Sequence, residues 1–354
     1  MIKIAKTQNP NAAKYQEKKK VMITGAGGAI GCHVLNKVLQ ETVWDVVITD
    51  SYRHKGDFDR VATVLDGLEV ADRLTHIVHD LQTPFSAREI DSLRGVDYIV
   101  NLASLSDVQA SIDDPAPFIV NNCALAVNML ELAREIQPEM FIQFSTDEVY
   151  GADTNVGYGH PEWDTILPSN PYSASKAAQE AISIAYWRSY GVPVVITNTM
   201  NNFGEMQGAS KYTTMIQSKL QKDESVTVHA AGDGQIGSRF YIHSENTADA
   251  VLFLLTNTTA YRHQSGHLDR PDRYNIAGDR QVDNLELAKI VAKLMGKELD
   301  YKLVNFHADQ PGHDLHYGLT DDKMRDLGWV PPMNFEDSMI RTIEWQKANP
   351  QWMK

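Results

Sequence analysis

The stretch Val21-Met22-Ile23-Thr24-Gly25-Ala26-Gly27-Gly28-Ala29-Ile30-Gly31 joins a short apolar run to a cluster of glycines, and a helical pattern follows over about residues 29–40. Glycines in such a turn let backbone N–H groups approach a pyrophosphate closely, and the start of the helix supplies a positive potential. The cluster here follows a strand pattern and opens a helix, as the dinucleotide-binding motif requires. The stretch therefore predicts the first strand, turn and helix of a dinucleotide-binding domain.

Further short apolar runs follow, and helical patterns separate most of them. The runs are Val46–Thr49, His76–His79, Tyr98–Leu102, Phe141–Ser145 and Val194–Thr197, and the clearest helical patterns are Pro117–Ile136 and Ser173–Tyr190. Short strands that alternate with helices predict an α/β fold with a doubly wound parallel sheet of the Rossmann type. Ligands bind beyond the carboxyl ends of the strands in such a sheet, so we expect the chemical residues directly after the apolar runs.

The pattern divides the chain into three parts. Residues 1–19 form a polar N-terminal arm, and residues 20–200 form the dinucleotide-binding domain. The texture loosens after about residue 200, which predicts that residues 201–354 form mainly a smaller C-terminal α/β substrate domain. We expect a later segment, about residues 235–260, to return to the first domain.

The composition excludes several classes of protein. The 354 residues carry a net charge of -13, and an acidic surface repels nucleic-acid backbones. Cys32 and Cys123 have no metal-like neighbours and fit free thiols in a reducing compartment. The longest purely apolar stretch, Ala250–Leu255, is too short for a membrane span, and the arm lacks the apolar region of a secretory signal. We therefore expect a cytoplasmic protein without a nucleic-acid, membrane or metal partner.

Acidic residues end the next two strand patterns. Asp50 lies about twenty residues after the glycine cluster, where a carboxylate accepts a hydrogen bond from a ribose 2′-OH and repels a 2′-phosphate. This position favours NAD over NADP, with the nearby Arg53 as the feature against that choice. Asp80-Leu81 ends the third run, at the depth expected for the adenine.

Hydroxyl, carboxyl and amine groups gather after the fifth apolar run. Ser145-Thr146-Asp147-Glu148 directly follows it, and Tyr172 and Lys176 lie one turn apart on the next helix. An ammonium close to a phenol lowers the phenol pKa, so that the phenolate can act as a base near neutral pH. The adjacent carboxyls suit an acid and a base whose environments separate their pKa values. The alternatives are a solvated carboxyl pair that caps a helix and a tyrosine–lysine pair on the surface.

These motifs resemble the extended short-chain dehydrogenase/reductases, and the similarity runs from about residue 20 to the C-terminus. Thr146-Asp147-Glu148 makes the chain similar to the dTDP-glucose 4,6-dehydratase family in particular, because epimerases of the superfamily lack the acidic pair. Further matching segments are Asn201–Gly204, Arg239, Tyr274–Ile276, Pro311–Asp314, Leu327–Trp329 and Thr342–Trp345.

The resemblance implies dehydration of a nucleotide-linked hexose: hydride leaves C4 for NAD, water is eliminated across C5 and C6, and the hydride returns to C6. It implies that Tyr172 takes the proton of the sugar 4-OH, while Thr146 hydrogen-bonds the 4-oxygen. Glu148 removes the C5 proton, and Asp147 protonates the departing 6-OH. Lys176 holds the nicotinamide ribose.

The resemblance also implies the residues of two binding sites and a homodimer formed through the two long helices. The NAD-binding positions are Gly25, Gly28, Ala29, Ile30, Gly31, Asp50, Asp80, Leu81, Leu102, Ala103, Tyr172 and Lys176. The substrate-binding positions are Ser104, Asn202, Lys211, Arg239, Asn275 and His313.

Several positions depart from the family pattern. Asn101 stands where the family has a histidine, and Ser104 replaces an alanine. Glu205 replaces a proline and predicts an acid near the diphosphate region, while Gln310 and His316 replace arginines. A UDP-sugar or another nucleotide therefore remains an alternative to a dTDP-sugar.

Two other functions remain open on the sequence. A nucleotide-sugar 4-epimerase or 4-dehydrogenase would use Tyr172 and NAD without dehydration, and the acidic pair argues against it because simple C4 chemistry needs no acid for a 6-OH. A non-catalytic protein that senses NAD or a nucleotide sugar needs neither Tyr172 as a base nor Lys176 as its activator, so their presence argues against that function.

Overall fold

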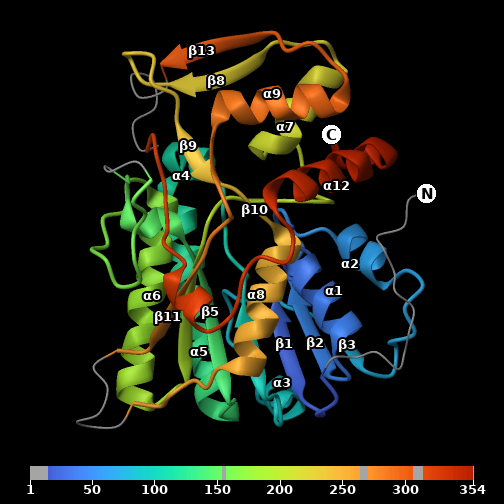
Figure 1. The fold of residues 1–354 in the computed structure, drawn as a ribbon. Coiled ribbons are helices and arrows are strands. Elements are labelled where there is room, and N and C mark those ends of the chain that lie inside the picture. The colour runs from blue at the N-terminus through green and yellow to red at the C-terminus, as the bar shows by residue number, and fades with distance from the viewer. Residues whose placement is uncertain (1–14, 154–156, 264–269, 306–313, 354) are drawn as a thin grey trace.

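A seven-stranded parallel sheet forms the centre of the computed structural model, which describes residues 15–153, 157–263, 270–305 and 314–353 (Figure 1). The strand order is β11-β6-β5-β4-β1-β2-β3, and every neighbouring pair is parallel. The strands span Lys20–Thr24 (β1), Asp45–Asp50 (β2), Leu74–Val78 (β3), Tyr98–Asn101 (β4), Met140–Thr146 (β5), Val194–Thr199 (β6) and Asp272–Ile276 (β11). The predicted doubly wound sheet is confirmed.

Helices cover both faces of this sheet because successive strand residues point to opposite sides. Val21 of β1 belongs to one core with Leu35, whereas Met22 belongs to the other with Met129. The first core is closed by α1 (Gly31–Glu41), α2 (Phe58–Leu65) and α8 (Ser244–Asn257), and the second by α3 (Ala87–Leu93), α5 (Pro115–Ile136) and α6 (Pro171–Tyr190). Fully burying one such aliphatic side chain stabilises the fold by about 1.5–3 kcal/mol.

A smaller domain lies over one end of the sheet (Figure 1). Its core joins Ile216, Leu287 and Met339, which come from three separate helices. Its helices are α7 (Tyr212–Gln221), α9 (Asn284–Met295) and α12 (Phe335–Ala348), and its paired strands are β7 (Asn202–Phe203) with β10 (Ile242–His243), β8 (Val226–Ala230) with β13 (Tyr301–Asn305), and β9 (Ser238–Phe240) with β12 (Gln281–Asp283). The remaining short helices are α4 (Val108–Asp113), η1 (Asp147–Tyr150), α11 (Asp322–Asp326) and η2 (Pro350–Met353).

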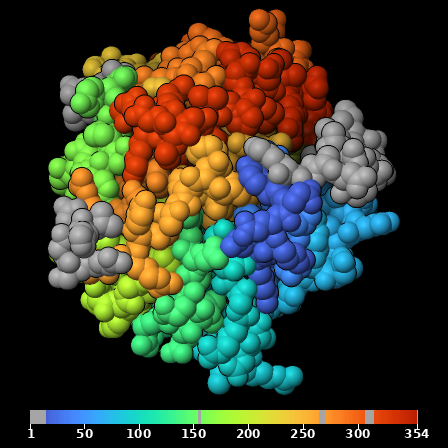
Figure 2. Space-filling model, turned by 60° about the horizontal axis from the view of Figure 1, so that its bottom comes forward, coloured from blue at the N-terminus to red at the C-terminus, as the bar shows by residue number. Residues whose placement is uncertain are grey.

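Two later segments return to the first domain. Helix α8 packs beside α1, so residues 244–257 lie against the N-terminal part of the chain (Figure 2). The strand β11 pairs with β6 and adds a seventh strand that the sequence pattern did not predict. Three of its five residues are polar, and one of them, Arg273, is fully buried and pairs with Glu180 at 2.6 Å. A search for apolar runs therefore does not detect β11, although the ion pair lets this strand lie in the central sheet.

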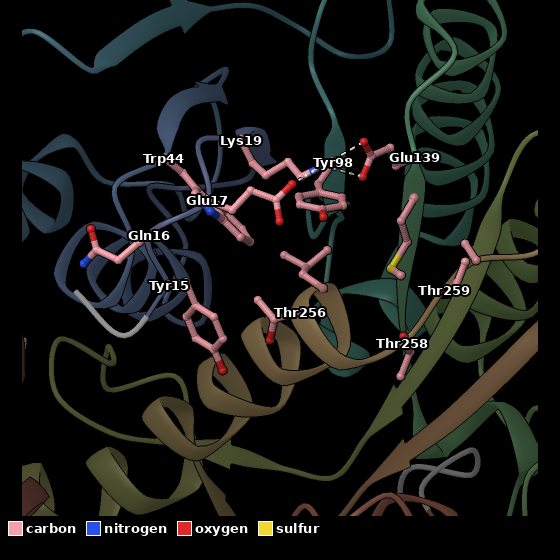
Figure 3. Close-up of a pocket in the computed structure, with 13 residues that line it drawn as sticks. Tyr15, Gln16, Glu17, Lys19, Trp44, Tyr98, Glu139, Thr256, Thr258 and Thr259 are labelled. Carbon is pink, nitrogen blue, oxygen red and sulfur yellow. Dashed lines mark hydrogen bonds and ion pairs between the residues drawn. The ribbon is translucent and has the colours of Figure 1, made fainter.

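Residues 15–19 are the described part of the predicted arm, and they run along the edge of the sheet where the strands begin. Lys19 Nζ lies 2.8 Å from a Glu139 carboxylate oxygen across this edge. Four residues of this segment line a cavity of about 460 Å³ together with Trp44 and Tyr98, namely Tyr15, Gln16, Glu17 and Lys19 (Figure 3). Ligands of a doubly wound sheet bind at the opposite, carboxyl edge. This cavity is therefore not the site that the glycine motif predicts.

Helix α5 is long and apolar enough to cross a membrane by length and composition, alone among the helices of the described residues. Half of its apolar window is buried inside the fold. Met129 and Leu130 are fully buried there between the sheet and α6. The apolar character of α5 thus matches its place in the core.

Candidate active site

The glycine turn between β1 and α1 has the close backbone packing that a dinucleotide needs. Gly25 has a φ of +68°, and a Cβ there would lie 3.0 Å from the backbone of Ala103. A Cβ on Gly31 would lie 2.1 Å from the carbonyl oxygen of Gly25, so only glycine allows the helix to start there. Ile30 precedes α1 without a side-chain cap, and the first turn holds no acidic residue. The first N–H groups of α1 therefore suit an anionic ligand.

Asp50 lies beside this turn at the end of β2. Its carboxylate accepts hydrogen bonds from the backbone N–H groups of Gly27 at 3.1 Å and Tyr52 at 2.9 Å. Arg53 does not approach Asp50 but pairs with Asp80 at 2.9 Å. A 2′-phosphate at this position would meet a carboxylate, whereas a 2′-hydroxyl can donate to it. The local charges therefore favour NAD over NADP.

The other predicted cofactor positions line the same carboxyl edge. Leu81 is buried after β3, and Leu102 is half-buried after β4. The Ala103 N–H donates to Thr24 Oγ1 at 3.0 Å, which holds the segment after β4 against the end of β1. Ala29 lies within the glycine turn, between Gly28 and Ile30. The segment after β4 is therefore fixed beside the glycine turn.

Asp147 is buried and Glu148 is half-buried, which argues against the alternative of a solvated carboxyl pair that caps a helix. Thr146 ends β5 and precedes η1, and its hydroxyl donates to Asp147 at 2.8 Å. Asp147 is 3% exposed, and its second carboxylate oxygen has no hydrogen-bond partner within the described part of the chain. Burial and the charge of Glu148 raise the pKa of Asp147 to about 7. Asp147 is therefore poised to carry a proton near neutral pH.

Glu148 lies in a different environment from its neighbour. Burial raises its pKa, while the Asn170 amide, which donates to its carboxylate at 3.2 Å, and the charges of Arg239 and Lys211 oppose the rise. Asn170 also caps α6 through Ser173, so the start of that helix fixes the amide in place. The two carboxyls thus differ in their partners, as an acid and a base require.

Tyr172 and Lys176 follow on the first turns of α6. Burial and the charges of Glu148 and Asp147 raise the pKa of Tyr172, while the Thr146 side chain, which hydrogen-bonds the phenol, lowers it. The prediction that Lys176 lowers this pKa is therefore wrong for the structure. Lys176 uses two of its three N–H donors inside the fold: its ammonium donates to the Phe144 carbonyl at 2.7 Å and to Gln179 Oε1 at 2.6 Å.

Cationic side chains approach the carboxyls from the smaller domain. Lys211 donates to the Ser106 carbonyl at 3.3 Å, and Arg239 stacks over Tyr317 at 4.3 Å. Both charges act on Glu148. Lys55, which the sequence did not single out, is close enough to lower the pKa of Lys211, although burial lowers that pKa most. A basic group therefore faces the carboxyl pair in an otherwise acidic protein.

Comparison with known proteins follows this geometry. The model of the "NAD dependent epimerase/dehydratase family" matches residues 21–277. The chain belongs to this family. Its cofactor is accordingly NAD, which is also bound in similar solved structures.

The relatives of this epimerase/dehydratase family member include 4,6-dehydratases. The dTDP-glucose 4,6-dehydratase of Shigella flexneri is 30% identical over 358 residues, covering 95% of this chain and 94% of that protein. A trifunctional UDP-glucose 4,6-dehydratase of Arabidopsis thaliana, RHM2, is 30% identical over 337 residues, and the match covers 94% of this chain but 48% of that longer protein. DesIV, a dTDP-glucose 4,6-dehydratase from Streptomyces venezuelae solved with NAD and TYD, has a TM-score of 0.82 at 26% identity, covering 95% of this chain and all of that one.

The remaining predicted substrate residues of the family member are held in internal contacts. Ser104 Oγ donates to the Leu105 carbonyl at 3.0 Å, and the Asn202 amide donates to the Met200 carbonyl at 2.9 Å. Asn275 is fully buried in β11, where its amide donates to the His160 carbonyl at 2.9 Å. The structure thus uses the Asn275 side chain inside the fold. His313 lies outside the described residues, as does Gln310.

Glu205 corrects the expectation of an extra acid near the diphosphate. It is 1% exposed, and its carboxylate lies 2.6 Å from Arg341 Nε and 3.1 Å from His243 Nε2. Burial opposes its ionisation, but the charges of His243, His33 and Arg341 hold its pKa below the usual range. Its charge is therefore compensated inside the protein and does not repel a substrate phosphate.

Two more departures from the family pattern, His316 and Asn101, are also buried. His316 is hydrogen-bonded to Ser238 at 2.7 Å, and burial together with the charge of Arg239 lowers its pKa. It therefore does not supply the charge of the arginine that it replaces. Asn101 is fully buried and bonds Gln143 at 2.9 Å, inside the sheet. Among the residues that the structure describes, no group of three or more His, Cys, Asp or Glu side chains could hold a metal ion.

Proposed function

We propose that this protein dehydrates an NDP-hexose, dTDP-glucose first among them, to the NDP-4-keto-6-deoxyhexose. The observation that carries the proposal is the carboxyl pair of buried Asp147, which is hydrogen-bonded to Thr146, and half-buried Glu148, both of which act on the pKa of Tyr172. Oxidation at C4 alone needs one base, whereas removing water from C5 and C6 needs a second base and an acid. The similarity to named 4,6-dehydratases supports the same assignment.

The cofactor fits the glycine turn and the carboxylate beside it. Gly25 and Gly31 leave room where a Cβ would clash, and Asp50 stands ready to accept from a ribose hydroxyl. Bound NAD would accept the C4 hydride and give it back at C6, so no NAD would be consumed. The polypeptide has to hold the cofactor and move three protons.

Each proton has a residue suited to it. Tyr172, hydrogen-bonded to Thr146, takes the proton of the 4-OH as C4 is oxidised. Protonation of Asp147 removes one of the two negative charges that raise the Tyr172 pKa, so a protonated Asp147 favours the tyrosinate. The ketone at C4 acidifies C5, and Glu148 takes that proton, which it gives back to C5 when the hydride adds to C6. Asp147, with a pKa of about 7, gives its proton to the 6-OH, which leaves as water.

The test is a screen of nucleotide hexoses with purified protein and added NAD, read by mass spectrometry. We expect loss of one water from dTDP-glucose and an alkali-dependent ultraviolet absorbance of the 4-keto product. Dehydration of UDP-glucose instead would keep the reaction and change the nucleobase. Absence of water loss with every nucleotide hexose would refute the proposal, and an isomer of unchanged mass would assign a 4-epimerase.

A further inference from the structure

Lys176 is held by a neutral acceptor, and that acceptor belongs to a buried chain of hydrogen bonds. Gln179 Oε1 accepts from Lys176 Nζ at 2.6 Å and from Gln143 Nε2 at 3.2 Å. Gln143 Oε1 in turn accepts from Asn101 Nδ2 at 2.9 Å, and Asn101 Oδ1 accepts from the Thr24 hydroxyl at 2.8 Å. Lys176 is 3% exposed, and the other four residues are fully buried.

This chain of hydrogen bonds crosses the sheet between the glycine turn and Lys176, the two places where the cofactor is expected to bind. Thr24 ends β1 directly before the glycine turn, and its hydroxyl accepts from the Ala103 N–H at 3.0 Å. Asn101 ends β4, Gln143 lies in β5, and Gln179 lies in α6 one turn after Lys176. The chain therefore connects the start of the glycine turn to the lysine expected to hold the nicotinamide ribose.

The hydrogen bonds of this chain all run from donor to acceptor in one order, and that order sets which atom of the Gln179 amide faces Lys176. Because the Asn101 carbonyl oxygen accepts from Thr24, its NH2 group faces Gln143, and the NH2 group of Gln143 then faces Gln179. A flipped Gln179 amide would place its NH2 group against two donors. It would also lose the bond from Gln179 Nε2 to the Asn122 carbonyl, which is 2.8 Å long.

We propose that Gln179 is a positioning residue for Lys176, and that the directional chain from Thr24 through Asn101 and Gln143 keeps its carbonyl oxygen facing the lysine. The inference rests on the proposed function and on the role that the family resemblance implies for Lys176, which is to hold the nicotinamide ribose. Each amide in the chain is neutral, so the acceptor keeps its direction over the working pH range. Two carbonyl acceptors favour the charged form of a buried lysine through hydrogen bonds, without a carboxylate in direct contact with the ammonium.

The charged groups around Lys176 are few. Glu180 lies one turn further along α6 and raises the Lys176 pKa, although its carboxylate is paired with Arg273 at 2.6 Å. Tyr172 lies one turn earlier, and Asp147 and Glu148 act on its phenol from η1. Burial prevails and lowers the Lys176 pKa to about 7. Loss of one carbonyl acceptor therefore changes the charge of Lys176 near neutral pH.

The test is a direct titration of Lys176 in the full protein. Protein labelled with 13C at the lysine ε-carbons is titrated by NMR, and the Lys176 signal is assigned by its absence in Lys176→Met. In Gln179→Leu we expect its pKa to fall by about one pH unit, because the charged form loses an acceptor. In Gln179→Glu, which has nearly the same shape, we expect it to rise, because a carboxylate then faces the ammonium.

Two further variants distinguish an effect of the hydrogen-bonded chain from a general effect of changing a buried side chain. Asn101→Leu touches no atom bonded to Lys176, and we expect a smaller fall in the Lys176 pKa as Gln143 loses its orientation. Gln346→Leu is the matched control, since Gln346 is also fully buried and bonded to another glutamine side chain, Gln217, and it should leave the titration unchanged. The titration needs no substrate, so it gives its answer even if the protein dehydrates no sugar.

The outcomes decide the proposal. Opposite shifts in the two Gln179 variants, with a smaller fall in Asn101→Leu, support it. An unchanged Lys176 pKa in both Gln179 variants, or shifts in the same direction, would make Gln179 a packing residue and overturn the proposal. A shift in the Gln179 variants with none in Asn101→Leu would overturn the role of the chain.

Discussion

Replacing Asp147 by asparagine should make the protein more stable and less active. Asparagine keeps an oxygen that can accept from the Thr146 hydroxyl, which now donates to Asp147 at 2.8 Å. It cannot ionise in its buried position and cannot give a proton to a leaving 6-OH. The same substitution therefore removes an energetic cost of the fold and the proposed acid of the reaction.

The magnitude follows from the Asp147 pKa, which burial and the Glu148 charge raise from 3.8 to about 7. At about 1.4 kcal/mol per pH unit, ionising Asp147 in the fold costs about 4 kcal/mol more than ionising it in the unfolded chain. Because the folded state holds this proton more tightly, the contribution of Asp147 to stability falls as pH rises from about 4 to about 7. Asp147→Asn should therefore gain up to about 4 kcal/mol over wild type at about pH 8, and about 2 kcal/mol less than that at about pH 5.

The assay is urea unfolding of both proteins at these two pH values, joined to a rapid-mixing measurement of activity. Loss of a general acid should slow water elimination by about 10²- to 10⁴-fold, so reduced nicotinamide should accumulate after C4 oxidation. Asp45→Asn is the control: Asp45 forms an exposed ion pair with Lys18 at 2.7 Å, and such pairs contribute about 0–1 kcal/mol. Equal stability of Asp147→Asn and wild type at about pH 8, or wild-type turnover by the variant, would refute the reasoning.

Three further predictions test other parts of the site and the assembly. Glu148→Gln should still oxidise C4 but exchange the C5 proton with solvent about 10²- to 10⁴-fold more slowly, and exchange at the wild-type rate would exclude Glu148 as the base. Asp50→Ala should weaken NAD binding about 10- to 100-fold in calorimetry, the value of a charge-assisted hydrogen bond, and unchanged affinity would mean that Asp50 does not contact the ribose. We propose a homodimer through α5 and α6, so Val120→Lys, at a residue 62% exposed on α5, should give monomers in equilibrium sedimentation, whereas a monomeric wild type would contradict the dimer.

The central sheet could be predicted from sequence because its strands are apolar and its glycine turn has one dominant use. The runs around Val21, Val46 and Phe141 mark strands directly, and the ends of the last two place Asp50 and Thr146 at the carboxyl edge. The same reasoning misses β11, where the charge of Arg273 interrupts the pattern. Its partner Glu180 lies 93 positions away in the chain, so no local pattern reveals the pair.

The candidate site could be predicted in its members but not in its electrostatics. Position after a strand end selected Asp147 and Glu148, and spacing from Lys176 on the next helix selected Tyr172. The direction of the Tyr172 pKa was wrong because the sequence does not show that Lys176 turns toward Phe144 and Gln179. Burial depth and the orientation of each donor decide such a shift, and both depend on the packed fold.

Long-range polar partners account for the remaining differences. The sequence predicted Glu205 to be an acid near the substrate diphosphate. Its partners Arg341 and His243 come from distant segments, so no local pattern shows that its charge is compensated. The hydrogen-bonded chain from Thr24 to Gln179 joins four elements, and neither Gln143 nor Gln179 stands out in its own stretch of sequence. Lys55 escaped notice for the same reason, since its ion pair with Asp107 and its bond to Ser210 are tertiary contacts.

In the proposed reaction a hydride leaves C4, the carboxyl pair removes the C5 proton and the 6-OH as water, and the same hydride returns to C6. The most direct measurement gives the protein dTDP-glucose, and in parallel UDP-glucose, deuterated at C4 and locates the deuterium in the product by NMR and mass spectrometry. We predict a product that has lost one water and carries the deuterium at C6. Deuterium that remains at C4 in a sugar of unchanged composition would contradict the account.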